Sequence, residues 1–350
     1  MRRRPVHLAL ALLAASVLGC SGPNPDAADL AAPTDLATSA DLAADLVAPP
    51  DLVAVDLAVP NALVEHIVKP AETDPAIDNW LEDHYAYRDF RVPAQGALVV
   101  YLAGASGTPS GTVAMLKELA SYGFPVVGLR YCNDYAIVDI CNADPDPDCH
   151  GKLRLEALDG QDHHPAISVS LPNGIDNRLP RLLAYLQRRW PGEGWGAYLD
   201  GERARWGKII VAGISHGASA AGRIGKARPV ARAVMLSGPY DSKAGVPAAW
   251  TSSTPAATAP AGFFGFSHTQ DTQSPQHLKD FVSLGLGALG AVQPVDAAKA
   301  PYNQSHQLTT SVMAKDAATA HSSTQAGGAS PKAADGTPAY RPVWRYLFGL

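Results

Sequence analysis

The chain has 350 residues, of which 47% are hydrophobic and 17% are charged, so it carries enough apolar material to bury a large core. Its formal net charge is −5. A nucleic-acid-binding protein needs a basic face, and this charge balance gives no support for one. We therefore expect a globular protein without a nucleic-acid partner.

The first 19 residues have the pattern of an export signal. Residues 2–4 are arginines, and residues 6–18 form an apolar run that is too short to span a bilayer comfortably. The run leads into Val-Leu-Gly-Cys at 17–20, which resembles a bacterial lipobox, whose cysteine becomes the lipidated first residue. Ser21 follows Cys20, and by the same resemblance this favours the outer membrane. We expect an exported protein that a lipid on Cys20 anchors to the envelope; the alternative is an ordinary secretory signal.

Residues 20–60 are of low complexity. The dipeptide Asp-Leu recurs at irregular intervals among alanine, valine and proline, so no amphipathic face results. This composition predicts a disordered tether that follows the lipidated cysteine. The change in composition near residue 61 marks the start of the globular domain, 61–350.

Three further cysteines follow the tether. Cys141 and Cys149 flank a short polar loop and can close it as a disulfide in an oxidising compartment, whereas Cys132 ends an apolar run and suits a buried thiol; other pairings remain open. Three aspartates in the loop alternate with proline, but the glycine turn and distal glutamate of an EF-hand are absent. No zinc or dinucleotide motif is present in the sequence. We expect no metal and no cofactor.

Apolar runs and helical spacing alternate along the domain. Short apolar runs predict strands at 97–102, 124–129, 208–213, 231–236, 262–266 and 308–313. Apolar residues at helical spacing predict helices at 112–122 and 178–189. We expect the irregular segment 132–175 to cover the functional site. Strands separated by long, partly helical connections indicate the α/β class, with a doubly wound, mostly parallel sheet in a single domain.

Residues 213–217, Gly-Ile-Ser-His-Gly, match the pattern G-x-S-x-G. They directly follow the strand residues 208–212 and open a helix of small residues, which is the setting of a nucleophile elbow. Such a turn presents the Ser215 hydroxyl at a helix N-terminus, where the dipole favours a developing anion. Ser215 is therefore the candidate nucleophile; an inert serine in a tight turn is the alternative.

With these elements the chain resembles secreted bacterial α/β-hydrolases. The matching stretches are 100–104, 128–131, 177–179, Trp195, Trp206, 213–217, 237–241, 264–271 and 342–346. Similar proteins often have glutamine where this chain has His216, and Gly-Thr-Gly where it has Gly-Ala-Ser at 104–106. These changes keep the backbone donors but alter side chains near the site. The resemblance implies a serine hydrolase that acts on an ester or a related acyl bond.

A serine hydroxyl needs a base, and the base needs an acid to orient it. Two acids follow predicted strands, Asp241 after 231–236 and Asp271 after 262–266. The placement usual in the resembled family favours Asp271 and leaves Asp241 as the alternative. For the base, His321 follows the strand at 308–313 and so returns to the sheet edge of Ser215, whereas His306 precedes that strand and lies at the opposite edge.

The resemblance also implies two backbone donors for the oxyanion. One is the N–H of His216, and the other comes from the loop after the strand at 97–102, where we select Ala105. We therefore expect an exported serine esterase that acts on a small or polymeric acyl substrate. The alternatives are a surface lipoprotein that uses the fold as a binding module, and an acyltransferase with the same triad.

Overall fold

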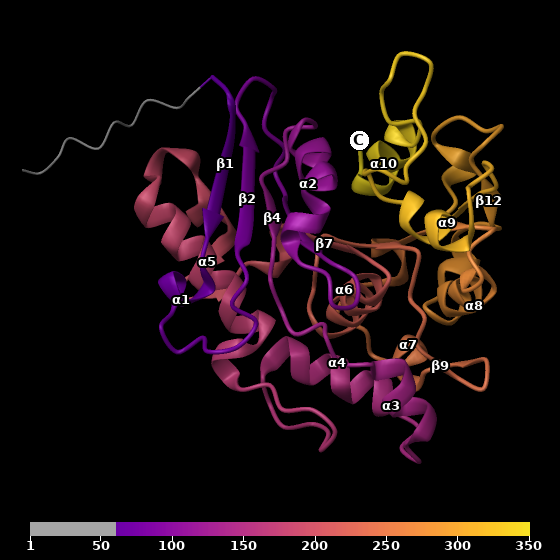
Figure 1. The fold of residues 1–350 in the computed structure, drawn as a ribbon, viewed down its shortest axis with the longest axis horizontal. Coiled ribbons are helices and arrows are strands. Elements are labelled where there is room, and N and C mark those ends of the chain that lie inside the picture. Colours follow the sequence, from indigo (N-terminus) through magenta and orange to yellow (C-terminus); the bar gives the residue numbers. More distant parts are fainter. Residues whose placement is uncertain (1–60) are drawn as a thin grey trace, which may run out of the picture. The chain divides into compact units, whose positions relative to one another are not determined.

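The computed structural model describes residues 61–350 (Figure 1). The predicted export signal, the lipidation site Cys20 and the tether therefore lie outside the described residues. Among residues 61–350, no helix combines the length and the apolar character that a membrane crossing requires.

A nine-stranded sheet forms the centre of the domain. In spatial order its strands are β1 (Leu63–Val68), β2 (His84–Asp89), β4 (Val126–Gly128), β3 (Leu98–Leu102), β7 (Ile209–Ile214), β8 (Arg232–Leu236), β11 (Phe263–His268), β13 (Gln307–Thr310) and β12 (Gln293–Pro294). β2 runs antiparallel to both of its neighbours, and every pairing from β4 to β12 is parallel. This confirms the predicted mostly parallel α/β sheet, and the strand order with its antiparallel β2 is that of the α/β-hydrolase fold.

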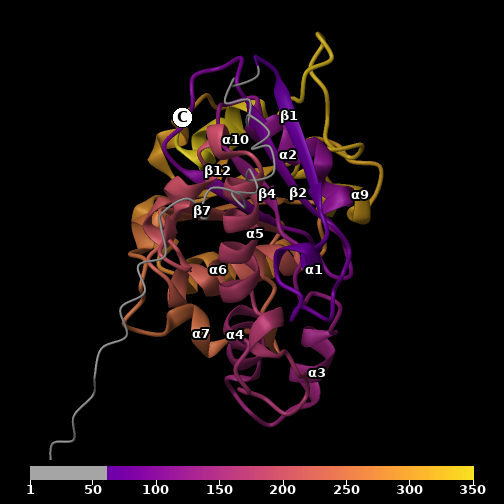
Figure 2. The same ribbon diagram turned by 90° about the vertical axis from the view of Figure 1, so that its left-hand side faces the viewer.

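Helices cover both faces of the sheet. One face packs against α2 (Val113–Ala120) and α10 (Arg341–Phe348). The other packs against α5 (Ile175–Arg189), α6 (His216–Ala227) and α8 (Ser274–Ser283), as Figures 1 and 2 show. Every residue of β3 and of β7 is buried, because strands covered on both faces must be apolar throughout. The remaining α-helices are α1 (Pro70–Thr73), α3 (Ile137–Ala143), α4 (Cys149–Asp159), α7 (Ala249–Ser252) and α9 (Ala317–Ser323), and the remaining strands form the short hairpins β5–β6 (Leu199–Asp200, Arg203–Ala204) and β9–β10 (Ser242–Lys243, Val246–Pro247).

Two parts of the domain differ from the sequence prediction. The segment 132–175, expected to be irregular, contains the helices α3 and α4. The last predicted strand ends early, at Thr310. There the Thr310 hydroxyl and the backbone N–H of Ser311 donate to the side chain of Asp296, which takes the place of a neighbouring strand as acceptor for Ser311. The two edge strands β1 and β12, and β2 beside β1, were not predicted.

A disulfide joins the two helices of the 132–175 segment. Cys141 in α3 pairs with Cys149 at the start of α4, with 5.5 Å between their Cα atoms. Cys132 is a free, buried thiol, and burial raises its pKa. The bond therefore ties α3, which lines a hollow beside Ser215, to α4; both helices are labelled in Figure 1.

Candidate active site

Ser215 occupies a strained turn between β7 and α6. Its backbone lies at φ 57° and ψ −121°, a region that non-glycine residues rarely adopt. The two glycines of the motif make the turn possible. A Cβ on Gly213 would lie 2.5 Å from the carbonyl group of Gly217, and a Cβ on Gly217 would lie 2.1 Å from the carbonyl oxygen of Leu102. The motif therefore folds as the elbow that its pattern predicts.

The structure brings His321 and Asp271 together. His321 lies in α9, and its Nδ1 is 2.7 Å from Oδ2 of Asp271. Oδ1 of Asp271 accepts the backbone N–H of Gln273 at 2.9 Å. Burial of Asp271 opposes ionisation, but these two hydrogen bonds hold the pKa of its carboxyl below the ordinary value. Asp271 is therefore an ionised acceptor that fixes the imidazole of His321.

Ser215 lies where two hollows meet. The first, which we name the His321 hollow, has a volume of about 300 Å³ and is lined by Ser215, His321, Gln325 and the loop 103–112. The second, the Tyr240 hollow, has a volume of about 230 Å³. It is lined by Ala105, Tyr135, Ala136, Ile137, Val138, Asp139, Arg154, Ser215, His216, Ser219, Tyr240 and Gln273. Ser215 and Ala105 border both hollows.

Asp241, the alternative acid, has a different partner. It is fully buried, and the guanidinium of Arg154 in α4 donates to both of its oxygens, with 2.6 Å between Nη2 and Oδ1. The indole of Trp250 donates to Oδ2 at 3.0 Å. Burial alone would raise the pKa of Asp241, but Arg154 holds it at about 2. The structure thus uses Asp241 in an internal ion pair and pairs His321 with Asp271.

His306, the competing base, lies away from these residues. It precedes β13, its Nδ1–H donates to the carbonyl of Phe263 at 2.8 Å, and its ring stacks on Phe264 with 3.9 Å between centroids. Burial lowers its pKa. His306 therefore packs at the opposite end of the parallel strands from Ser215.

The candidate oxyanion donors border Ser215. Within residues 61–350, neither the N–H of Ala105 nor that of His216 donates to an acceptor. Gly104 lies against the serine, since a Cβ there would be 3.9 Å from Ser215 Oγ. Both N–H groups are therefore available to a ligand that lies over Ser215.

Sequence reasoning missed the residue that holds the loop around the candidate oxyanion donor Ala105. Asn133 is fully buried, and its side-chain amide donates to the carbonyls of Gly104 at 2.6 Å and Gly107 at 2.8 Å. Its own carbonyl accepts the N–H of Ser106 at 2.9 Å. These bonds join segments about 30 residues apart in the sequence, so no local pattern could have revealed them.

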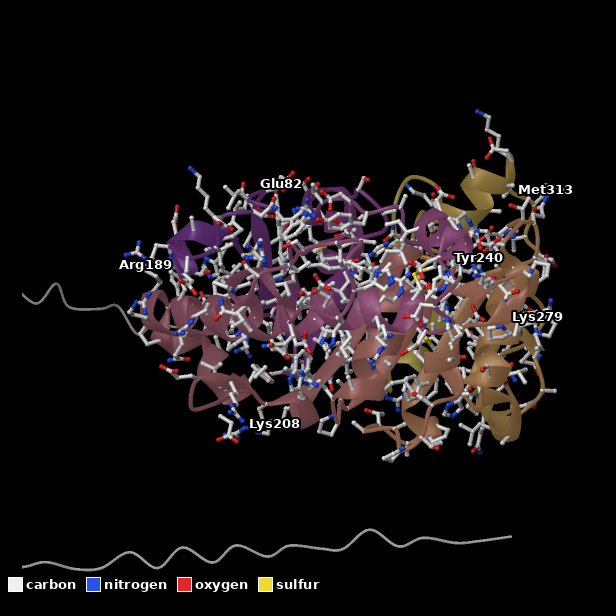
Figure 3. The ribbon with its side chains drawn as sticks, turned by 90° about the horizontal axis from the view of Figure 1, so that it is seen from below. Glu82, Arg189, Lys208, Tyr240, Lys279 and Met313 are labelled. Atoms are coloured by element: carbon white, nitrogen blue, oxygen red, sulfur yellow. A yellow bond between two sulfur atoms is a disulfide. The ribbon has the colours of Figure 1, made fainter. Side chains whose placement is uncertain are left out.

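Tyr240 and His277 were also missed. Tyr240, labelled in Figure 3, follows β8, lines the Tyr240 hollow and meets the ring of His277 edge to face. Nδ1 of His277 is 2.9 Å from Ser267 Oγ and 4.0 Å from Asp271 Oδ2. Burial lowers the pKa of His277 to about 4, so its ring is neutral at pH 7.

Among residues 61–350, one group of potential metal ligands lies where the acidic loop between α3 and α4 meets the start of α4 and the segment after it. Atoms of Asp144, Cys149 and His164 lie within 4.8 Å of one another. The sulfur of Cys149 is committed to the disulfide and cannot act as a thiolate ligand. Asp144 instead pairs with His164 at 3.3 Å, and Asp146 pairs with Lys152 at 2.6 Å.

Comparisons with known proteins find structural likeness at low sequence identity. No protein-family profile matches the chain, and no curated protein matches it either. Among solved structures, a Klebsiella pneumoniae protein provisionally named a dienelactone hydrolase is similar, with 11% sequence identity and a TM-score of 0.40. The match covers 83% of this chain and all of that one. At this distance the likeness says nothing about activity or substrate.

Proposed function

We propose that this protein is a serine hydrolase that cleaves carboxylic esters, with Ser215 as nucleophile, His321 as general base and Asp271 as the orienting acid. The observation that carries the proposal is the 2.7 Å pairing of His321 with a buried, ionised Asp271 beside the hollow that Ser215 borders. The strained elbow adds support, because strain of this kind collects at functional sites.

The reaction proceeds in two halves. Ser215 Oγ attacks the ester carbonyl carbon while Nε2 of His321 accepts its proton, and the N–H groups of Ala105 and His216 bind the resulting oxyanion. The intermediate collapses, the bond to the alcohol oxygen breaks, and His321 gives its proton to that oxygen. Water, deprotonated by His321, then attacks the acyl-enzyme, releasing the carboxylic acid and regenerating Ser215.

The chain's own groups supply every step, so the proposed mechanism needs no metal or cofactor. Asp271 remains ionised throughout and stabilises the imidazolium of His321. His216 contributes its backbone N–H, and its side chain does not act as a proton donor. Burial is the main cause that lowers the pKa of this imidazole to about 3, and the nearby charge of Arg154 adds to it.

We also propose that the protein works outside the cytoplasm, held to the envelope by a lipid on Cys20. The signal pattern of residues 1–19 supports this location, and so does the disulfide Cys141–Cys149, since disulfides persist in oxidising compartments. Metabolic labelling with a radioactive fatty acid should mark the wild-type protein and not Cys20→Ala. Equal labelling of both would contradict the anchor.

An alkyl fluorophosphonate probe tests the enzymatic proposal. The reagent should label the purified wild-type protein, and mass spectrometry should place the adduct on Ser215. The variant Ser215→Ala should not react. Ser252→Ala, an exposed serine in α7, is the matched control and should label like wild type. A folded wild-type protein that does not react with the probe would overturn the proposal. In a separate ester assay with an added alcohol, a product in which the acyl group is joined to that alcohol would show acyl transfer in place of hydrolysis.

A further inference from the structure

The two hollows beside Ser215 have different walls, and this difference assigns them to different parts of a substrate. We infer that the Tyr240 hollow holds the acyl group and that the enzyme selects esters of short, uncharged acyl chains. The inference rests on the proposed function and adds the substrate class to it.

The base decides which hollow takes which group. In the first half of the reaction, the proton on His321 must reach the alcohol oxygen as the ester bond breaks. The alcohol therefore lies on the side of His321, which lines the His321 hollow. The carbonyl carbon lies at Ser215, and its oxygen lies at the N–H groups of Ala105 and His216. The acyl chain then extends into the Tyr240 hollow, which Ala105 and His216 also line.

The Tyr240 hollow is small and its walls are fixed. Its volume of about 230 Å³ lies below the roughly 300–1,000 Å³ that is usual for pockets of drug-sized ligands. Val138 of α3 is half-buried at one wall, while Ile137 beside it is buried in a cluster with the cysteines of the disulfide. The disulfide holds α3 to α4, which contributes Arg154. A long chain would have to displace a helix that is covalently fastened.

The charges around the hollow favour an uncharged chain. Arg154 lines it, but the guanidinium donates to both oxygens of Asp241, so its charge is offset. The imidazole of His216 is neutral at pH 7 because burial depresses its pKa to about 3. Asp139 adds an exposed carboxylate to the lining. No uncompensated cation of the described residues therefore faces this space, and an anionic acyl group would gain no ion pair there.

A series of 4-nitrophenyl esters tests the assignment, because a common leaving group keeps intrinsic reactivity similar. For the full-length protein we expect kcat/KM for the octanoate to be about tenfold or more below that for the butanoate, since the pocket rejects surplus methylenes. The mono-4-nitrophenyl ester of succinic acid should also react more slowly than the butanoate. A ratio of octanoate to butanoate near one or above would overturn the size assignment, and a faster succinate ester would overturn the charge assignment.

Two variants at one position locate the selectivity. Val138→Ala should raise the octanoate-to-butanoate ratio of kcat/KM, and Val138→Phe should lower the butanoate-to-acetate ratio. Val246→Phe is the matched control, since Val246 is 66% exposed and lies outside both hollows, and it should leave every ratio unchanged. If folded Val138 variants keep the wild-type ratios, the Tyr240 hollow does not hold the acyl chain.

The fluorophosphonate result separates the two levels of failure. If Ser215 is not labelled, the serine hydrolase proposal fails. If Ser215 is labelled but the esters show no preference for short chains, or none is cleaved, the short-acyl assignment fails and the reactive serine stands.

Discussion

Asp241 and Asp271 follow neighbouring strands of one sheet, and both are buried, yet they serve opposite purposes. Asp241 is 0% exposed and closed into an ion pair with Arg154, which in turn is buried. Asp271 is 3% exposed and pairs with His321, whose side chain stays partly open to a hollow. The comparison teaches that the partner of a buried carboxylate decides what the carboxylate can do. A carboxylate paired with a buried guanidinium has a structural role, whereas one that holds an accessible imidazole can support chemistry.

Asp271→Asn should produce the largest effect. An amide keeps the volume but cannot hold the imidazole in the required tautomer or stabilise its charged form, so kcat should fall by about three to four orders of magnitude. Steady-state hydrolysis of 4-nitrophenyl butanoate measures the loss, and a melting temperature close to wild type shows that the fold persists. A decrease of less than tenfold would remove Asp271 from the proposed triad.

Asp241→Asn should act on stability. Removing the carboxylate leaves Arg154 buried without a counter-charge, which costs about 3–5 kcal/mol for a pair of this kind. Urea unfolding measures the change, and activity per folded molecule should stay within tenfold of wild type. The double variant with Arg154→Gln removes the orphaned charge and should regain part of the lost stability. If Asp241→Asn instead abolished activity while Asp271→Asn did not, the two roles would be reversed.

Asp280, which lies next to Asp241, should make the stability of the protein depend on pH. Asp280 is buried near Asp241 and accepts its backbone N–H at 3.3 Å; burial raises the pKa of Asp280 to about 8. Because this folded-state pKa lies above the ordinary value of 3.8, the contribution of Asp280 to stability is complete below pH 3.8 and is lost as the pH rises through about 8.

Asp280→Asn should therefore lose less thermal stability between pH 5 and pH 8 than wild type, as melting temperatures at the two pH values would show. The exposed Asp162→Asn is the matched control and should follow wild type. Equal losses in wild type and Asp280→Asn would show that Asp280 is ionised in the folded protein.

The neighbour of Asp271 should give the smallest effect. His277 is neutral at pH 7 and lies 4.0 Å from Asp271 Oδ2, beyond hydrogen-bond distance. His277→Phe keeps a ring of similar volume, so we expect kcat/KM to fall by less than about tenfold. Steady-state hydrolysis of 4-nitrophenyl butanoate by the purified variant measures this change in kcat/KM. A loss as large as that of Asp271→Asn, in a folded protein, would make His277 the partner of the acid.

The sequence allowed most of the sheet to be predicted, because its central strands are short apolar runs buried on both faces and the elbow is a local pattern. It could not decide between Asp241 and Asp271 from the residues alone, since each follows a strand in the same way and their partners, Arg154 and His321, come from distant segments. Asn133 was missed for the same reason. The helix α3 was missed because its burial depends on a disulfide and a neighbouring helix, and a seven-residue helix carries too little periodicity to be recognised.

The backbone of Ser215 has a consequence for how the protein can be altered. A side chain at φ 57° costs of order 1–3 kcal/mol, and only glycine relieves it. Ser215→Gly should therefore unfold at a higher temperature than Ser215→Ala, although both are expected to be inactive, and differential scanning calorimetry would show the order. Directed evolution that selects only for heat resistance would thus favour replacement of the proposed nucleophile, so screens for robust variants of this protein should also select for the proposed ester cleavage at every round.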